Sequence, residues 1–79
     1  MHILFFAQLK DATGQSEAEL VLGESVDAEG LWQILVGVHP ALGCFRNSVR
    51  LARNCEYVGL DARFSDADEV ALIPPVSGG

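Results

Sequence analysis

The sequence predicts an α+β roll in which a mixed sheet packs on one main helix and an extended tail follows the last strand. Residues 2–9 and 69–73 are apolar with a two-residue periodicity, which is typical of strands. Residues 28–38 carry apolar side chains at helical spacing, which predicts one amphipathic helix. One helix cannot cover both faces of a sheet, so we expect one packed face and one face that is partly wet.

The first strand and its neighbour in the chain are predicted to form a hairpin. Residues 10–15 have the composition of a turn, and residues 16–22 alternate apolar and polar side chains again. In residues 2–9 one face is mixed, with Leu4 and Phe6 between polar ends. The other face is apolar throughout and consists of Ile3, Phe5, Ala7 and Leu9.

The helix has a signal at each end. Asp27 is a suitable N-cap, because its carboxylate can accept a hydrogen bond from the first turn, and the helix must end before Pro40. Gly30 in the first turn costs about 1 kcal/mol relative to alanine. The predicted apolar stripe consists of Ala28, Leu31, Leu35 and Val38, flanked by Trp32 and Ile34.

The second half of the chain predicts short extended segments and a final strand. After a loop at residues 39–43, residues 48–54 are expected to form a strand and residues 57–60 another extended piece. Residues 65–68 have the composition of a polar turn, and residues 69–73 follow as the last strand. A parallel pairing of the first and last strands needs a crossover connection, which the helix supplies.

The C-terminal segment points to chemistry at the chain end. Two prolines at positions 74 and 75 fix φ and favour an extended segment after Ile73. A six-residue tail, residues 74–79, would reach roughly 20 Å from a body made of residues 1–73. A terminal glycine carboxylate can be activated as an acyl-adenylate, and no Cβ crowds its carbon. We therefore expect the reactive group at Gly79, the alternative being a frayed end without chemistry.

The alternation of side chains also predicts an exposed apolar patch. If the inner faces of the first and last strands cover the helix, Phe6 and Ile73 face solvent beside one another at the root of the tail. Contiguous apolar surface on a small protein usually marks an interaction site, so this patch would anchor a partner. The alternative is that both residues cover a second small cluster. The inner residues in this assignment are Ile3, Phe5, Val70 and Leu72.

Composition limits the classes of function. The 79 residues predict a single domain, and five basic against eleven acidic residues give a net charge of −6. Phosphate backbones would repel such a protein, so nucleic acid is an unsuitable ligand and a partner with a basic groove is favoured. No apolar run is long enough to span a membrane and no signal peptide is recognisable, so we expect a cytoplasmic protein without membrane contact.

The cysteines and histidines do not predict a metal site. Cys44 and Cys55 lack the spacing of zinc ligands and are expected to be reduced, structural thiols. His2 and His39 are isolated in the sequence, and neither is expected to bind metal or to act as a catalytic base.

The two ends of the chain resemble the small, sulfur-carrying subunits of molybdopterin synthases. The resemblance rests on residues 3–10 (ILFFAQLK) and residues 66–79 (DADEVALIPPVSGG), and it spans the whole chain. The segment from Leu31-Trp32 to His39-Pro40 and the run Ala52-Arg53-Asn54 also fit. A diglycine terminus alone is shared with ubiquitin-like modifiers and thiamin sulfur carriers. The run Pro-Pro-Val-Ser-Gly-Gly after an Asp-Glu-Val strand is more specific.

This resemblance implies a ubiquitin-like β-grasp fold and a defined chemistry. In that family a separate activating enzyme adenylates the terminal carboxylate with ATP, and a sulfur donor converts it to a thiocarboxylate, here a 1-thioglycine at Gly79. The tail then enters the large subunit of the synthase, in a hetero-oligomer expected to be a heterotetramer. There the sulfur attacks cyclic pyranopterin monophosphate during molybdenum cofactor biosynthesis. The carrier itself binds no cofactor and is not catalytic alone.

The resemblance also assigns roles to individual residues. Gly79 carries the acyl group, and Gly78 with Ser77 threads the channel of the large subunit. The apolar contact patch corresponds to Phe6, Tyr57 and Ile73, with Tyr57 at a position where an aliphatic residue is expected. Lys10 stands at a basic position near the patch where arginine would be commoner. The residues that hold the tail extended are Pro74, Pro75 and Val76.

Two other readings share part of this pattern. A sulfur carrier for transfer-RNA thiolation or thiamin synthesis, or a ubiquitin-like protein modifier, would share the fold and the terminus but not the acceptor. A pure interaction domain would have a tail without chemistry.

Overall fold

The computed structural model describes residues 1–59 and 61–74. Their strands form a five-stranded sheet, in the order β2-β1-β7-β4-β5, and a two-stranded sheet of β3 and β6. In chain order the elements are β1 (His2–Phe5), α1 (Gln8–Thr13), β2 (Glu17–Glu19), β3 (Val26–Asp27), α2 (Ala28–Val38), the 3-10 helix η1 (Pro40–Phe45), β4 (Arg50–Arg53), β5 (Glu56–Tyr57), β6 (Arg63–Phe64) and β7 (Glu69–Ile73).

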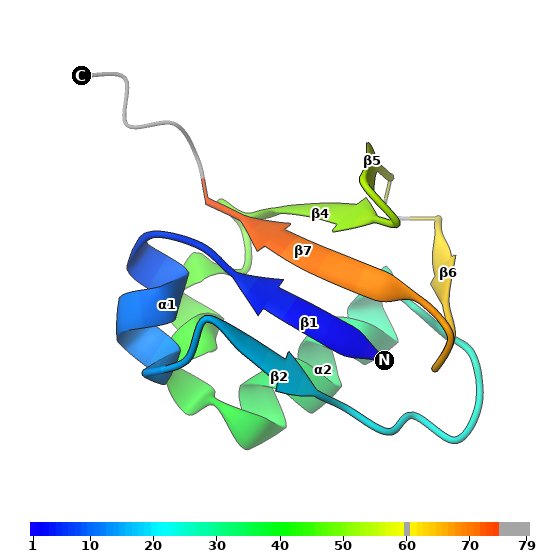
Figure 1. Cartoon of the computed structure of the whole chain (residues 1–79), viewed down its shortest axis with the longest axis horizontal. Coiled ribbons are helices and arrows are strands. Elements are labelled where there is room, and N and C mark those ends of the chain that lie inside the picture. Colours follow the sequence, from blue (N-terminus) through cyan, green and yellow to red (C-terminus); the bar gives the residue numbers. More distant parts are fainter. Residues whose placement is uncertain (60, 75–79) are drawn as a thin grey trace.

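The first and last strands lie side by side and parallel at the centre of the larger sheet. His2 pairs with Glu69 and Phe5 with Leu72, while β2 and β4 flank this pair in antiparallel orientation. The main helix α2 crosses one face of the sheet, and the other face is open (Figure 1). The predicted α+β roll, with its parallel crossover through the helix, is confirmed.

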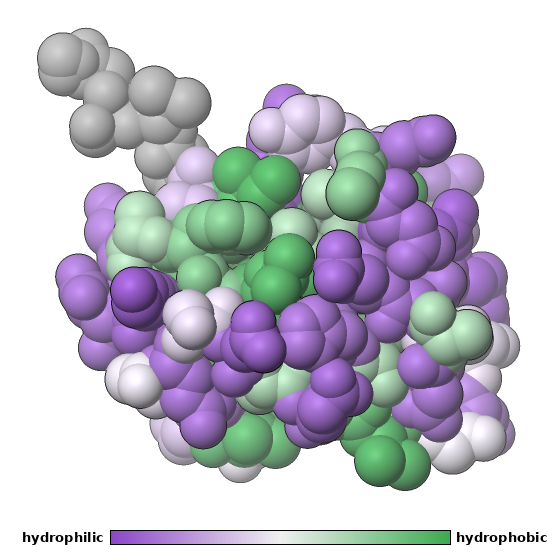
Figure 2. Space-filling view, in the orientation of Figure 1, coloured by the Kyte–Doolittle hydropathy of each residue, from purple (hydrophilic) through white to green (hydrophobic). Residues whose placement is uncertain are grey.

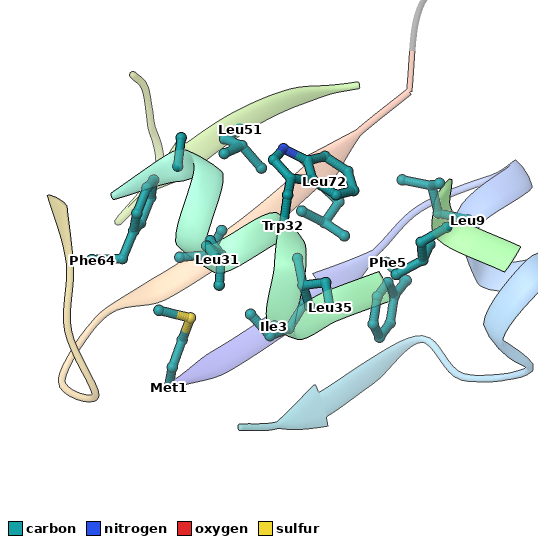
Figure 3. Packing of buried hydrophobic residues seen from close by; sticks show 13 residues of the cluster. Met1, Ile3, Phe5, Leu9, Leu31, Trp32, Leu35, Leu51, Phe64 and Leu72 are labelled. Carbon is teal, nitrogen blue, oxygen red and sulfur yellow. The ribbon is translucent and has the colours of Figure 1, made fainter. Parts of the chain in front are cut away.

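The core fills the space between α2 and the inner face of the sheet (Figure 3). Leu31, Trp32 and Leu35 of α2 pack in one cluster with the inward residues of β1 and β7. The predicted inner residues of these two strands are all at most 2% exposed: Ile3, Phe5, Val70 and Leu72. The face assignment for both central strands is therefore confirmed.

Local chemistry explains where α2 begins. The Gly30 N–H donates to the Asp27 Oδ1 at 2.8 Å, which confirms the predicted cap. A Cβ on residue 30 would lie 3.2 Å from the Cβ of Val26 and 3.3 Å from that same carboxylate oxygen. Gly30 has a low helix propensity, but its lack of a side chain leaves room for the Asp27 carboxylate that caps the helix.

The end of α2 corrects the predicted stripe. Val38 is 57% exposed, whereas Trp32, predicted only as a flanking residue, is buried. The next residue, His39, instead contacts the core residue Phe5, with the two rings nearly perpendicular and their centroids 5.7 Å apart. Of the predicted loop at residues 39–43, residues 40–43 are instead part of η1, which buries Leu42.

The connection after β1 also differs from the prediction. The strand ends at Phe5 because Ala7 adopts a φ of 48°, and residues 8–13 form α1 where a strand end and a turn were expected. The helix ends at Gly14, whose φ is 74° and whose N–H donates to the Lys10 carbonyl. Leu9 is still buried, but from a helix that packs on η1.

Three of the predicted strands are shorter than expected, and the two-stranded sheet of β3 and β6 was not predicted. β2 ends at Glu19, and the Asp66 carboxylate accepts hydrogen bonds from the main-chain N–H groups of Leu22 and Gly23 beyond it. β5 ends at Tyr57, whereas an extended piece was expected from residue 57 to residue 60. The final strand has the predicted bounds, because the turn before it is closed by Asp68, which accepts from the Ser65 N–H at 2.8 Å.

Within the described part of the chain, no helix is long and apolar enough to cross a bilayer.

Candidate functional site

The open face of the sheet carries a shallow apolar groove of about 310 Å³, which we call the sheet groove. It is lined by Leu4, Phe6, Ala52, Cys55, Tyr57, Glu69, Ala71 and Ile73. Figure 2 shows apolar side chains gathered on this face near the end of β7. The pleat explains the composition, since Val70 and Leu72 point to the core while Ala71 and Ile73 point outward.

Phe6 and Ile73 meet at the end of the sheet groove that lies next to the C-terminal segment. Phe5 and Leu72 pair in the parallel register, and Phe6 and Ile73 are the next residues along each chain segment. Both therefore lie at the carboxyl end of the two central strands. Phe6 is 46% exposed and Ile73 is half-buried. The predicted position of Phe6 and Ile73 on the open face is confirmed, and the alternative of a second buried cluster is wrong for Phe6. Partner binding at this patch stays a prediction.

Tyr57 forms the far wall of the sheet groove. It pairs with Ala52 across β4 and β5, which places its ring on the open face, where it is 61% exposed. The Arg50 guanidinium lies over this ring, 4.9 Å from its centroid, in a cation–π arrangement. Arg50 in turn pairs with Ile73 in the β4–β7 register. An aromatic wall and a cation therefore flank the last residue of β7.

The other predicted contact residues are placed less closely. Lys10 is exposed and belongs to α1, but it does not line the sheet groove. The helix α1 lies at the end of the sheet toward which β7 runs (Figure 1). Pro74 follows Ile73 and is half-buried. The remaining predicted residues, Pro75, Val76, Ser77, Gly78 and Gly79, lie outside the described residues.

Both cysteines depart from the prediction of structural thiols, because both are exposed. Cys55 has a φ of 73° in the turn between β4 and β5, and this turn brings it to the sheet groove. Among the described residues, no group of three or more His, Cys, Asp or Glu side chains could hold a metal ion.

Sequence reasoning missed several groove residues. Leu4 and Ala71 follow from the same alternation that identified Phe6 and Ile73. Cys55 had no such signal, because its place depends on a turn with two residues at positive φ. Arg50, which lies outside the groove lining over the Tyr57 ring, had none either, because its place depends on the register of β4. The Glu69 carboxylate marks the opposite end of the sheet groove from Ile73.

Two carboxylates hold the turn that leads into β7. Backbone hydrogen bonds from Leu22 and Gly23 lower the pKa of Asp66, and the N-terminal ammonium 3.5 Å away acts in the same direction. The Ser65 N–H lowers the pKa of Asp68, and the Asn54 amide adds to this effect. The Asp66-Ala67-Asp68 segment, which contributed to the family resemblance, thus has a structural role at the start of the strand.

At the opposite end of the open face, His2 lies among carboxylates. It pairs with Glu19 on β2 and with Glu69 on β7 in the strand registers. The hydrogen bond to Glu19 raises the pKa of His2, and the nearby charges of Glu17 and Glu69 add to the shift. This end of the face is acidic, in contrast to the Arg50 end.

The mixed sheet wrapped around one helix, with the first and last strands parallel at its centre, defines a small ubiquitin-like β-grasp protein with an apolar groove on the open face of its sheet. The ThiS family model matches residues 3–79, and the chain belongs to this family. The resemblance seen in the sequence is thereby confirmed.

Curated relatives and solved structures agree with this assignment. The molybdopterin synthase sulfur carrier subunit of Chlamydomonas reinhardtii is 37% identical over 79 residues, covering 98% of this chain and 95% of the relative. The human protein of the same name is 33% identical over 82 residues, covering 100% and 93%. The crystal structure of SAMP1 from Haloferax volcanii superposes with a TM-score of 0.85 at 30% identity, covering 100% of this chain and 98% of that one.

Proposed function

We propose that this chain is the sulfur carrier subunit of a molybdopterin synthase and that Gly79 carries the sulfur as a thiocarboxylate. The observation that carries the proposal is the sheet groove at the end of β7, where Phe6, Tyr57 and Ile73 present apolar surface directly before the C-terminal segment. The names of the relatives from Chlamydomonas reinhardtii and Homo sapiens support the same function.

The chemistry needs two steps at the terminal carboxylate. A carboxylate oxygen of Gly79 attacks the α-phosphate of ATP on a separate activating enzyme, and pyrophosphate leaves. Hydrosulfide, supplied by a sulfur donor, then attacks the acyl carbon of the adenylate, AMP leaves with the former carboxylate oxygen, a proton is lost, and a thiocarboxylate remains. Thiolates are stronger nucleophiles than carboxylates near neutral pH, so this exchange prepares the chain end for transfer. ATP and the sulfur donor belong to partners, and this chain supplies the acyl group.

Docking would then bring the sulfur to the precursor. In this proposal the sheet groove holds the large subunit, with Lys10 contributing a cation at the same end of the sheet. Pro74, Pro75 and Val76 keep the segment extended, and Ser77 with Gly78 passes through the channel to the precursor. Binding at the groove would hold the thiocarboxylate of Gly79 close to the precursor on the large subunit, which supplies proximity and orientation for the sulfur transfer. The assembly would be a cytoplasmic hetero-oligomer of both subunits, a heterotetramer.

A second candidate function has specific support. The curated small archaeal modifier protein 1 of Haloferax volcanii is 33% identical over 88 residues, which favours a protein modifier as the alternative. A modifier or a carrier for transfer-RNA thiolation or thiamin synthesis would share the activation step. These functions differ only in what receives the acyl group or the sulfur.

The acceptor therefore decides between the candidates. The chain in its thiocarboxylate form, mixed with the cognate large subunit and cyclic pyranopterin monophosphate, is expected to yield molybdopterin. The carboxylate form of the same chain is the control and should yield none. A thiocarboxylate form that binds the large subunit and leaves the precursor unchanged would contradict the proposal and favour another acceptor.

A further inference from the structure

Charged residues of opposite sign stand near the two ends of β7 on the open face of the sheet. At the start of β7, Glu69 lies near His2, with Glu17 and Glu19 on the neighbouring strand. At the end of β7, Arg50 stands opposite Ile73. Ile73 lies four positions after Glu69 along the strand, which corresponds to about 13 Å. The sheet groove therefore has a carboxylate at the Glu69 end, and a cation lies just outside its lining, over the Tyr57 ring.

The charged groups of Arg50 and Glu69 have no bonded partner in the described part of the molecule. Within residues 1–59 and 61–74, the Arg50 guanidinium and the Glu69 carboxylate make no hydrogen bond or ion pair. The other arginine of β4, Arg53, donates to the Arg63 carbonyl and is thereby occupied. The Arg50 guanidinium is therefore a cation without an ion-pair partner among the described residues, in a chain whose net charge is −6.

Tyr57 prepares Arg50 for a bound carboxylate. A guanidinium over an aromatic ring keeps its N–H donors at its edge, and the ring limits the rotamers that binding must otherwise order. Arginine can then hold a carboxylate through two parallel hydrogen bonds. The aromatic ring belongs to the sheet groove itself, so a carboxylate bound there would lie beside an apolar side chain seated in the groove.

We propose that Arg50 and Glu69 orient the partner on the sheet groove. The partner surface would carry an apolar residue for the groove, a carboxylate facing Arg50 next to the C-terminal segment, and a cation facing Glu69. Such an arrangement excludes the reversed orientation, in which like charges would meet at both ends. This inference rests on the proposed function, because the partner is the large subunit whose channel must receive the chain end.

A charge swap tests orientation separately from net charge. The variant R50E/E69K reverses the polarity of the groove and keeps the net charge of −6. Its matched control, R50E/E24K, has the same composition of charges but leaves Glu69 in place, since Glu24 is exposed and does not line the groove. Binding of each variant to the cognate large subunit is measured by calorimetry at low and at physiological salt, with thermal melting to check folding.

The inference predicts that R50E/E69K binds roughly tenfold or more weakly than the unmodified chain, and several-fold more weakly than R50E/E24K, with the difference reduced at high salt. The milder pair R50Q and E69Q should each weaken binding by a few-fold, and E24K should not. Equal binding by the swap and the unmodified chain would overturn this inference alone. Absence of any binding by the unmodified chain would overturn the proposed function, and this inference with it.

Discussion

Asn54 and Glu69 exchange two hydrogen bonds between the β4–β5 turn and the start of β7. The Asn54 N–H donates to the Glu69 carbonyl at 2.8 Å, and the Glu69 N–H donates to the Asn54 Oδ1 at 3.0 Å. The Asn54 Nδ2 also donates to Asp68 at 3.1 Å. Asn54 has a φ of 52°, a conformation that asparagine tolerates better than most residues. This clamp fixes the turn that supplies Cys55 and Tyr57 to the sheet groove.

Replacing Asn54 with alanine should lower the free energy of unfolding by about 2 kcal/mol, because two side-chain hydrogen bonds are lost and alanine is strained at positive φ. Asn54→Gly removes the backbone strain but also loses the side-chain hydrogen bonds. Its free energy of unfolding should therefore lie between those of the unmodified chain and Asn54→Ala. Urea unfolding of the three proteins measures both terms. If alanine and glycine variants both match the unmodified chain within about 0.5 kcal/mol, the clamp has no role in stability.

Acid should destabilise the fold through the turn before β7. The pKa values of Asp66 and Asp68 are lowered in the folded state, so the unfolded chain binds more protons as pH falls. Their contribution is fully present above the unfolded value near 3.9 and is lost as pH drops through the folded values. Urea midpoints between pH 7 and pH 2.5 should therefore decline below about pH 4. Asp66→Asn should flatten this decline, and an unchanged slope in that variant would exclude Asp66 as a cause.

His2 should titrate above its ordinary value near 6.5, because Glu19 accepts its hydrogen bond and Glu17 and Glu69 lie nearby. The stability that this interaction contributes is present below the unfolded value and is lost as pH rises through the folded one. An NMR titration of the imidazole measures the shift directly. Glu19→Gln should bring the midpoint down toward 6.5, and an unchanged midpoint in that variant would exclude Glu19 as the main cause.

Phe5 and Phe6 form a matched pair for separating folding from binding. Phe5 is 2% exposed in the core and Phe6 is 46% exposed on the sheet groove. Phe5→Ala should cost about 3–5 kcal/mol of stability, whereas Phe6→Ala should cost less than about 1 kcal/mol. Phe6→Asp should weaken binding of the large subunit about tenfold while melting close to the unmodified chain. A loss of several kcal/mol in Phe6→Asp would place that side chain in the core.

Features encoded locally could be predicted from the sequence. The helix α2 has its cap at Asp27 and its apolar spacing within a single segment, and the alternation in β1 and β7 identifies the core face without knowledge of any partner strand. Phe6 and Ile73 follow from the same alternation. The family resemblance added Tyr57, whose place on the groove depends on a short strand with little periodicity of its own.

Features that depend on tertiary contacts could not be predicted. The helix α1 exists because Ala7 takes a positive φ without glycine and because Leu9 finds a buried place against η1, and no local pattern indicates either. Arg50 comes opposite Ile73 only through the register of β4 against β7. The exposure of Cys55 depends in turn on two consecutive residues at positive φ.

Deleting Gly79 should remove sulfur transfer and leave the fold intact, because every residue of the described core precedes Ile73. Cooperative thermal melting at the temperature of the unmodified chain is the expected result. A loss of cooperativity in the truncated chain would show that the terminal residue contributes to folding.

The intact mass of the chain, measured after incubation with the cognate activating enzyme, ATP and a sulfur donor, tests the central claim most directly. We expect a species heavier by the replacement of one oxygen with sulfur, located at Gly79 by fragmentation and absent from the chain that lacks Gly79. If the chain keeps its original mass under these conditions, while a known carrier of the family is converted beside it, Gly79 is not a sulfur carrier.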